Sequence, residues 1–139
     1  MNNSQIELPV ELINAAKDAY QKAYAPYSQF HVGSAALTAS GEIIKGCNVE
    51  NASYGLTVCA ERNCISNAII QGERQLTIIV IYTEQEQLTP PCGACRQVIS
   101  EFFDSDAPVV ALNHKNEKQI WTVSELLPDA FTPKQLLDV

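Results

Sequence analysis

The sequence lacks the features that would place the chain in a membrane, in a secretory route or on a nucleic acid. No apolar run approaches the length of a membrane span, and no basic segment followed by an apolar one occurs at the amino terminus. Basic residues are few, nine against sixteen acidic ones, and the net charge is −7. Such a chain offers no basic surface to a phosphate backbone. We therefore expect a cytoplasmic protein that binds neither a membrane nor a nucleic acid.

Internal repeats, linkers and low-complexity segments are absent too. The 139 residues are 46% hydrophobic and 18% charged, which is typical of a globular chain. A chain of this length can bury roughly two-thirds of the surface that it exposes when unfolded, so it needs no disulfides to fold. We expect a single domain over residues 1–139.

The five cysteines are an odd number, which argues for metal binding or catalysis over a disulfide framework. Pro91 suits the first position of a helix, and Cys92 and Cys95 would then share one face of its first turn. The unpaired N–H groups and the helix dipole lower the pKa of thiols in that position, as a zinc ligand requires. Cys59, at the start of another apolar periodic segment, is the natural third ligand. Cys64 lies five residues further on, about 140° around a helix, and should face away.

Glu61, two residues beyond Cys59, favours a catalytic zinc site over a structural one. A structural site closes with four protein ligands, whereas a catalytic site uses three and leaves a position for water. Two alternatives stay open. Cys47 or Cys64 could close a four-sulfur structural site, and Cys92 with Cys95 could form a redox pair.

Hydrophobic periodicity predicts an alternation of helices and strands. The last two strands should be antiparallel, because residues 113–118 are too short for a parallel crossover. Asn48 and Glu50 fall at the end of a predicted hairpin, and an amide with a carboxylate suits a pair of sugar hydroxyls. The predicted helices cover residues 10–24, 58–70 and the stretch after 91, and the predicted strands cover 30–37, 42–49, 77–82, 108–112 and 119–123.

Two motifs, Cys59-Ala60-Glu61-Arg62 and Pro91-Cys92-Gly93-Ala94-Cys95-Arg96-Gln97, resemble the zinc signatures of the cytidine deaminase family, and three more segments match it in the same order. These segments span residues 25–30, 32–37 and 46–54. The resemblance runs from about Tyr20 to Phe131 and is to the small, single-domain, homotetrameric type. It implies an α/β fold of three layers, α/β/α, with a mixed five-stranded sheet whose first two strands form a hairpin and whose last two are antiparallel.

The resemblance also implies an activity, the zinc-dependent hydrolytic deamination of free cytidine and deoxycytidine in pyrimidine salvage. A zinc-bound hydroxide would attack C4 of the base, and Glu61 would carry the protons. Arg62 would offset the negative charge of the thiolates. The implied ligands of one Zn²⁺ per chain are Cys59, Cys92 and Cys95, and the implied substrate-binding residues are Phe30, Asn48, Glu50, Tyr54, Ala60 and Phe131.

The family pattern leaves two questions open. It also fits a deaminase of a cytosine-containing antibiotic, against which the pair of Asn48 and Glu50 argues. A homotetramer with shared active sites is implied as well, in which Phe131 would cover the base in a neighbouring subunit and Tyr54 would lie near a subunit boundary. Whether Phe131 and Tyr54 act in their own subunit or in a neighbour stays open, because Phe131 could also fold onto its own domain.

Overall fold

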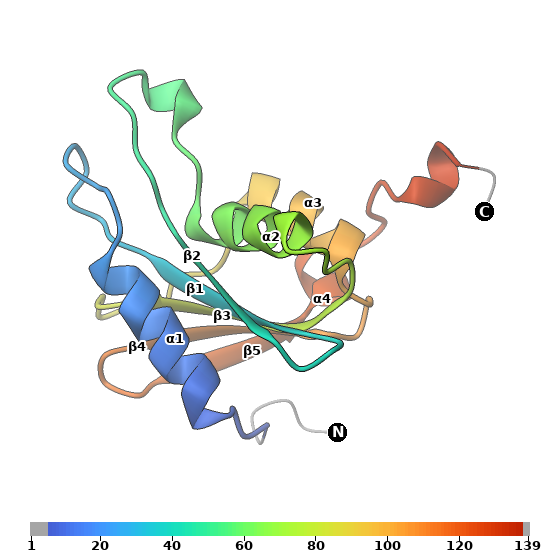
Figure 1. Cartoon of the computed structure of the whole chain (residues 1–139), viewed down its shortest axis with the longest axis horizontal. Coiled ribbons are helices and arrows are strands. Elements are labelled where there is room, and N and C mark those ends of the chain that lie inside the picture. Colours follow the sequence, from blue (N-terminus) through green and yellow to red (C-terminus); the bar gives the residue numbers. More distant parts are fainter. Residues whose placement is uncertain (1–5, 138–139) are drawn as a thin grey trace.

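A computed structural model describes residues 6–137, which form a mixed five-stranded sheet with helices on both faces. Figure 1 shows α1 on one face and α2, α3 and α4 on the other. The strands are β1 (Gly33–Thr38), β2 (Ile43–Cys47), β3 (Leu76–Thr83), β4 (Pro108–Asn113) and β5 (Lys118–Thr122). The helices are α1 (Val10–Gln21), α2 (Ala60–Ile70), α3 (Gly93–Phe102) and α4 (Val123–Leu126), with short 3₁₀ turns η2 (Tyr54–Leu56) and η3 (Pro133–Gln135).

The strand order is β2-β1-β3-β4-β5. β1 pairs antiparallel with both β2 and β3, β3 pairs parallel with β4, and β4 pairs antiparallel with β5. The predicted fold class is therefore confirmed, including the initial hairpin and the antiparallel final pair. That β1 lies between β2 and β3 is a result of the structure alone.

Two hydrophobic cores hold the layers together. Where the helices approach the sheet most closely, the strand residue is a glycine. A Cβ atom on Gly33 would lie 2.1 Å from the carbonyl oxygen of Ala16 in α1. A Cβ atom on Gly46 would lie 2.3 Å from the main-chain nitrogen of Cys64 in α2. Only residues without a side chain let both helices pack this tightly on the hairpin.

The first predicted helix and the first predicted strand were each too long at one end. The helix ends at Gln21 and not near Tyr24. The main chain of Tyr24 instead pairs with the segment after β2, since its N–H donates to the carbonyl of Asn48 at 3.0 Å. The strand begins at Gly33 and not at Phe30. The main chain of Phe30 and Val32 forms hydrogen bonds with the side chain of Asn48 instead of with a neighbouring strand.

The start of α3 also differs from the prediction. Its first helical residue is Gly93, so Cys92 is the N-cap and Pro91 precedes the helix. Cys59 is likewise the N-cap of α2. Two cysteines thus occupy the amino ends of two neighbouring helices, and both line a cavity together with Ile81 of β3. In the described part of the chain, no helix has the length and apolar character needed to cross a membrane.

Candidate metal centre and adjoining pocket

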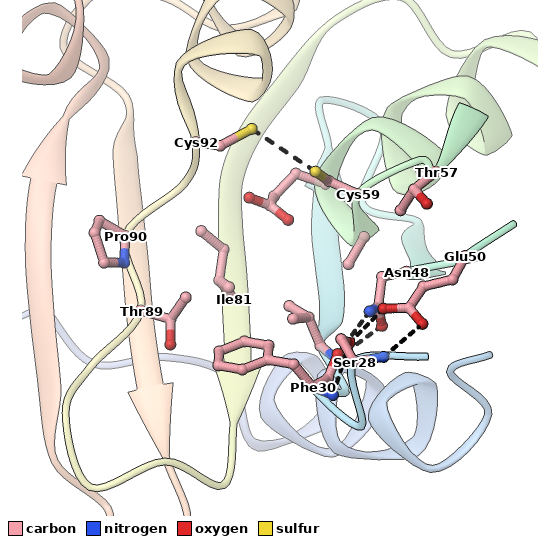
Figure 2. A pocket seen from close by; sticks show the side chains of 13 residues that line it. Ser28, Phe30, Asn48, Glu50, Thr57, Cys59, Ile81, Thr89, Pro90 and Cys92 are labelled. Atoms are coloured by element: carbon pink, nitrogen blue, oxygen red, sulfur yellow. Dashed lines mark hydrogen bonds between the residues drawn. The ribbon is translucent and has the colours of Figure 1, made fainter. Parts of the chain in front are cut away.

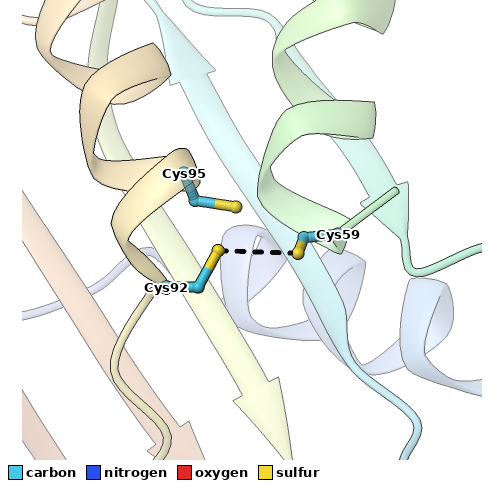
Figure 3. A group of neighbouring side chains, drawn as sticks. All are labelled: Cys59, Cys92 and Cys95. Carbon is cyan, nitrogen blue, oxygen red and sulfur yellow. Dashed lines mark hydrogen bonds between the residues drawn. The ribbon is translucent and has the colours of Figure 1, made fainter. Parts of the chain in front are cut away.

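Three cysteines from two helices converge at one point (Figure 3). The Sγ atoms of Cys59, Cys92 and Cys95 all lie within 4.8 Å of one another, and those of Cys59 and Cys92 are 3.7 Å apart. Cys95 is buried and Cys92 is exposed, so the group lies at the surface of a cavity and not inside the core. Cys59 and Cys92 are the N-cap residues of α2 and α3, so both stand at the positive ends of helix dipoles, where an anionic ligand group is favoured by position.

The surroundings of Cys59 stabilise its thiolate. A hydrogen bond from the Cys95 thiol and the neighbouring Arg62 guanidinium lower the pKa of Cys59 to about 5, against the opposing effect of burial. The Nη2 atom of Arg62 lies 3.5 Å from the Cys59 sulfur. These thiols in turn raise the pKa of Arg62 above its ordinary value. The arginine therefore stays charged beside the cluster, where its positive charge lies next to the Cys59 sulfur.

Zinc fits this group of ligands. A Zn–S bond of about 2.3 Å in a tetrahedron places two sulfurs about 3.8 Å apart. The 3.7 Å between the sulfurs of Cys59 and Cys92 matches that spacing. Three thiolates around a divalent cation leave a net charge of about −1 and one open position. Within residues 6–137, the Nε atom of Arg62 is a buried donor with no hydrogen-bond partner, which suits a cluster that carries excess negative charge.

Glu61 lies in the first turn of α2, directly beside the cluster, and is only 4% exposed. Burial raises the pKa of its carboxyl group to about 7, and the negative charge of Cys59 acts in the same direction. A carboxyl group with this pKa exists in both protonation states at neutral pH. It can therefore accept and release protons, as a general acid–base requires.

A cavity of about 240 Å³ opens from the cluster. In Figure 2, Cys59 and Cys92 lie at one end of it and Ser28 and Phe30 at the other. Thr89 and Pro90 form one side, and Asn48, Glu50 and Thr57 form the opposite side. Ala60 also lines it as the first residue of α2, where main-chain N–H groups have no acceptor within the helix. The walls are mostly apolar with polar groups at both ends, as in pockets for small molecules.

The carboxylate of Glu50 is held in place by the segment before β1. Its Oε1 atom accepts hydrogen bonds from the main-chain N–H groups of Tyr27 at 3.0 Å and Ser28 at 3.2 Å, and its Oε2 atom accepts one from the Ser28 hydroxyl. The Ser28 hydroxyl is the main cause that holds the pKa of Glu50 below its ordinary value. Oε2 keeps free lone pairs for a further donor.

Asn48 is almost fully buried and partly committed to the main chain. Its Oδ1 atom accepts from Val32 N–H at 2.9 Å, and its Nδ2 atom donates to the carbonyl of Phe30 at 2.8 Å. One N–H and one lone pair of the amide remain available. Asn48 therefore both orients Phe30 and can contact a ligand.

The structure does not bring Tyr54 or Phe131 into this cavity. Tyr54 is 72% exposed, and its ring makes an edge contact with that of Tyr27. It lines an adjoining hollow of about 290 Å³ that shares Ser28, Glu50 and Thr57 with the cavity. Phe131 is 55% exposed and does not line the cavity. The other predicted site residues, by contrast, gather around the cluster and the cavity.

The two remaining cysteines have other partners. Cys64 is fully buried, and its thiol donates to the carbonyl of Ile44 at 3.4 Å. Cys47 is half-buried, and its thiol donates to the carbonyl of Lys22 at 3.6 Å. Neither belongs to the metal-binding group of the described chain. This arrangement counts against the four-sulfur alternative.

Some pocket residues were not predicted. The cavity is also lined by Ser28, Thr57, Thr89 and Pro90, for which the sequence alone predicts no role. Ser28 stood inside a segment that resembled the family, and this was the available signal. Thr89 and Pro90 precede the second cysteine motif but carry no pattern that points to a pocket wall.

Together the α/β/α fold and the three-thiolate group beside a buried carboxylate define a zinc-dependent deaminase. Residues 7–112 match the sequence profile of the cytidine and deoxycytidylate deaminase zinc-binding region. The chain belongs to this family.

Named relatives support the same conclusion. A cytidine deaminase of Halalkalibacterium halodurans is 46% identical over 91% of this chain and 96% of the relative. A cytidine deaminase of Sporosarcina psychrophila is 43% identical over 91% of this chain and 93% of the relative. The crystal structure of a cytidine deaminase from Burkholderia pseudomallei has a TM-score of 0.85 at 45% identity, covering 90% of this chain and 100% of that one.

Proposed function

We propose that this chain catalyses the zinc-dependent hydrolytic deamination of free cytidine and deoxycytidine to uridine and deoxyuridine. Water replaces the amino group at C4 of the base, and ammonia leaves. The C4–N bond breaks, a C4–O bond forms, and no electrons are exchanged with another reactant. In a cell this reaction would serve pyrimidine salvage in the cytoplasm.

The observation that carries the proposal is the layout of the cavity. The three thiolates and Glu61 lie at one end, and Asn48 and Glu50 line the cavity away from them. A nucleoside carries a reactive amidine at one end and hydroxyl groups at the other. Its base can thus face the metal ligands while its sugar faces the amide and the carboxylate, with the ring of Phe30 lying against it.

The residues around the metal divide the chemistry between them. Cys59, Cys92 and Cys95 would hold Zn²⁺, which would lower the pKa of water to about 7 and so supply a nucleophile near neutral pH. Glu61 takes up a proton from the attacking water and delivers protons to N3 of the base and to the departing amine. Its pKa of about 7 suits both directions of transfer.

The sugar end explains the preference for nucleosides. The Oε2 atom of Glu50 can accept a hydrogen bond from a ribose hydroxyl, and the free N–H of Asn48 can donate one. A phosphate group on the sugar would meet the negative charge of Glu50, which repels it. This pair also argues against an antibiotic substrate that lacks a ribose.

A direct assay tests the proposal. Zinc-loaded protein is incubated with cytidine, and both the loss of cytosine absorbance and the release of ammonia are followed. Equal amounts of uridine and ammonia are expected, and the Glu61→Gln variant should form both at a rate lower by about 10² to 10⁴. A zinc-loaded protein that converts no cytidine or deoxycytidine would refute the function.

The proposal includes a homotetramer with shared active sites. Its support is the exposure of Phe131 and Tyr54 and the course of the C-terminal segment, which extends away from the body in Figure 1. An aromatic ring on such an extension can reach a neighbouring copy of the chain. We propose that Phe131 covers the base in that neighbour and that Tyr54 lies at the subunit boundary.

A further inference from the structure

The segment Glu84–Thr89, which connects β3 to Pro90, shapes one side of the cavity. Thr89 and Pro90 line the cavity opposite Asn48 and Glu50, as Figure 2 shows. The segment has no regular secondary structure over most of its length. Its position must therefore come from contacts with other parts of the fold.

Asn113, the last residue of β4, makes such contacts. It is 0% exposed, and its Oδ1 atom accepts from the N–H groups of Lys115 at 3.0 Å and Glu117 at 3.1 Å. Its Nδ2 atom donates to the Glu117 carboxylate at 2.9 Å and to the carbonyl oxygens of Gln85 at 3.2 Å and Glu86 at 3.4 Å. The oxygen thus closes the turn between β4 and β5, and the nitrogen reaches the segment after β3.

Two further contacts hold the same segment. The hydroxyls of Thr83 and Thr89 are 3.2 Å apart, which ties its two ends together. Lys115, in the β4–β5 turn, pairs with the carboxylate of Glu86. In Figure 1 this turn lies beside the segment that follows β3. The segment is therefore tied at both ends and at its middle.

The bonds from Nδ2 to Gln85 and Glu86 are not needed by the hairpin itself. The Oδ1 bonds and the main-chain bond from Asn113 N–H to the carbonyl of Glu117 at 3.2 Å already close the turn. A buried amide that donates to a neighbouring segment orders that segment. Without it, the main-chain carbonyls of Gln85 and Glu86 would lose this hydrogen-bond partner.

We propose that Asn113 is a positioning residue for the substrate: it holds the segment Glu84–Thr89 so that Thr89 and Pro90 form the wall opposite Asn48 and Glu50. This inference rests on the proposed function. The metal ligands depend less on this clamp, because Cys92 and Cys95 are fixed by α3 and Cys59 by α2. Loosening the segment should therefore weaken substrate binding more than zinc binding or the chemical step.

The test is the Asn113→Asp variant, which keeps Oδ1 for the turn and removes the donor to Gln85 and Glu86. The same change also removes the bond to Glu117 and places a second carboxylate beside it, so Thr89→Val, which adds no charge, is measured alongside. The KM for cytidine should rise about tenfold, the change expected when one or two hydrogen bonds that order a binding wall are lost. The kcat should stay within about threefold, because groups that act only in the transition state are untouched. Zinc content should remain one per chain, and amide hydrogen exchange over residues 84–90 should become faster.

The matched control is Asn116→Gly in the same turn. Asn116 has a φ of 61°, which glycine adopts without strain, and its N–H bonds only the carbonyl of Asn113. Its KM and exchange rates should match those of the wild-type protein. Thr89→Val, which removes the hydroxyl pair with Thr83, should raise KM in the same direction and serves if Asn113→Asp does not fold.

Two results would overturn the inference. One is a wild-type KM in Asn113→Asp, or in Thr89→Val where the first variant does not fold. The other is a loss of zinc that accounts for the whole loss of activity. Failure of the proposed function looks different, because the wild-type protein itself would then not convert cytidine.

Discussion

The side-chain amide of Gln97 donates a hydrogen bond of 2.9 Å to the main-chain carbonyl of Phe131. Its neighbour Arg96 bonds the carbonyl of Leu126 at 3.2 Å and that of Pro91 at 2.8 Å. The helix that carries Cys95 thus also holds the C-terminal segment at two points. The position of Cys95 and the position of the segment that carries Phe131 therefore both depend on α3.

Phe131→Ala should raise the KM for cytidine about tenfold while zinc stays bound, because an aromatic contact with the base is lost. Gln97→Ala should raise it in the same direction, since Phe131 loses its anchor. The double variant should have the same KM as Phe131→Ala alone, because both changes remove the same contact between Phe131 and the base. Steady-state kinetics and sedimentation together check this. A chain that sediments as a monomer while fully active would contradict the shared site.

Glu61→Gln should fold and retain zinc but lose about 10² to 10⁴ in kcat, because the amide keeps the shape of the side chain and cannot carry protons. Metal analysis and steady-state kinetics separate the two effects. If the variant instead lost metal and its remaining activity followed its zinc content, Glu61 would be a ligand.

Cys59→Ser should lose most of its zinc, because two thiolates leave the metal half-coordinated. Cys64→Ser should keep one zinc per chain, since its thiol bonds the carbonyl of Ile44 and faces the core. Burial raises the pKa of Cys64 to about 12, so a thiol reagent should not modify it in the folded protein. If Cys64→Ser lost its zinc while Cys59→Ser kept it, the ligand assignment would be overturned.

Substrate binding should persist to lower pH than an ordinary glutamate allows. The Ser28 hydroxyl keeps the pKa of Glu50 low, so its carboxylate stays charged as the pH falls, and KM should rise only below the usual glutamate range. In Ser28→Ala that pKa moves up, and the rise in KM should begin at a higher pH. Ser28→Thr, which keeps a hydroxyl, should behave like the wild-type protein. Identical pH profiles for Ser28→Ala and the wild type would contradict this role.

Cytidine should be converted with a far higher kcat/KM than cytidine monophosphate, because the phosphate would lie near the Glu50 carboxylate. Glu50→Gln removes that charge, while its amide still contacts the sugar. The ratio of the kcat/KM for cytidine to the kcat/KM for cytidine monophosphate should therefore fall. A comparable kcat/KM for both substrates in the wild-type protein, or activity on a single-stranded oligonucleotide, would refute this selectivity.

Local patterns in the sequence were sufficient for the type and order of the main helices and strands and for the proximity of Cys92 and Cys95. The spacing of these two cysteines predicts two thiols on one face of a helix, and their sulfurs lie within 4.8 Å of each other. The approach of Cys59, 33 residues before Cys92, depends instead on the packing of α2 beside α3. The short link between the last two strands predicts their antiparallel pairing, which is confirmed. These features depend on residues close together in the chain, where periodicity and helix geometry act directly.

Contacts between distant segments were decided by the tertiary structure alone. The insertion of β1 between β2 and β3, the bonds from Ser28 to Glu50 across 22 residues and those from Asn113 to Gln85 across 28 residues leave no local pattern. They arise because each buried or orienting polar group must find a partner once the sheet has assembled. The residue types were present in the sequence, but only packing of the layers determined which of them meet.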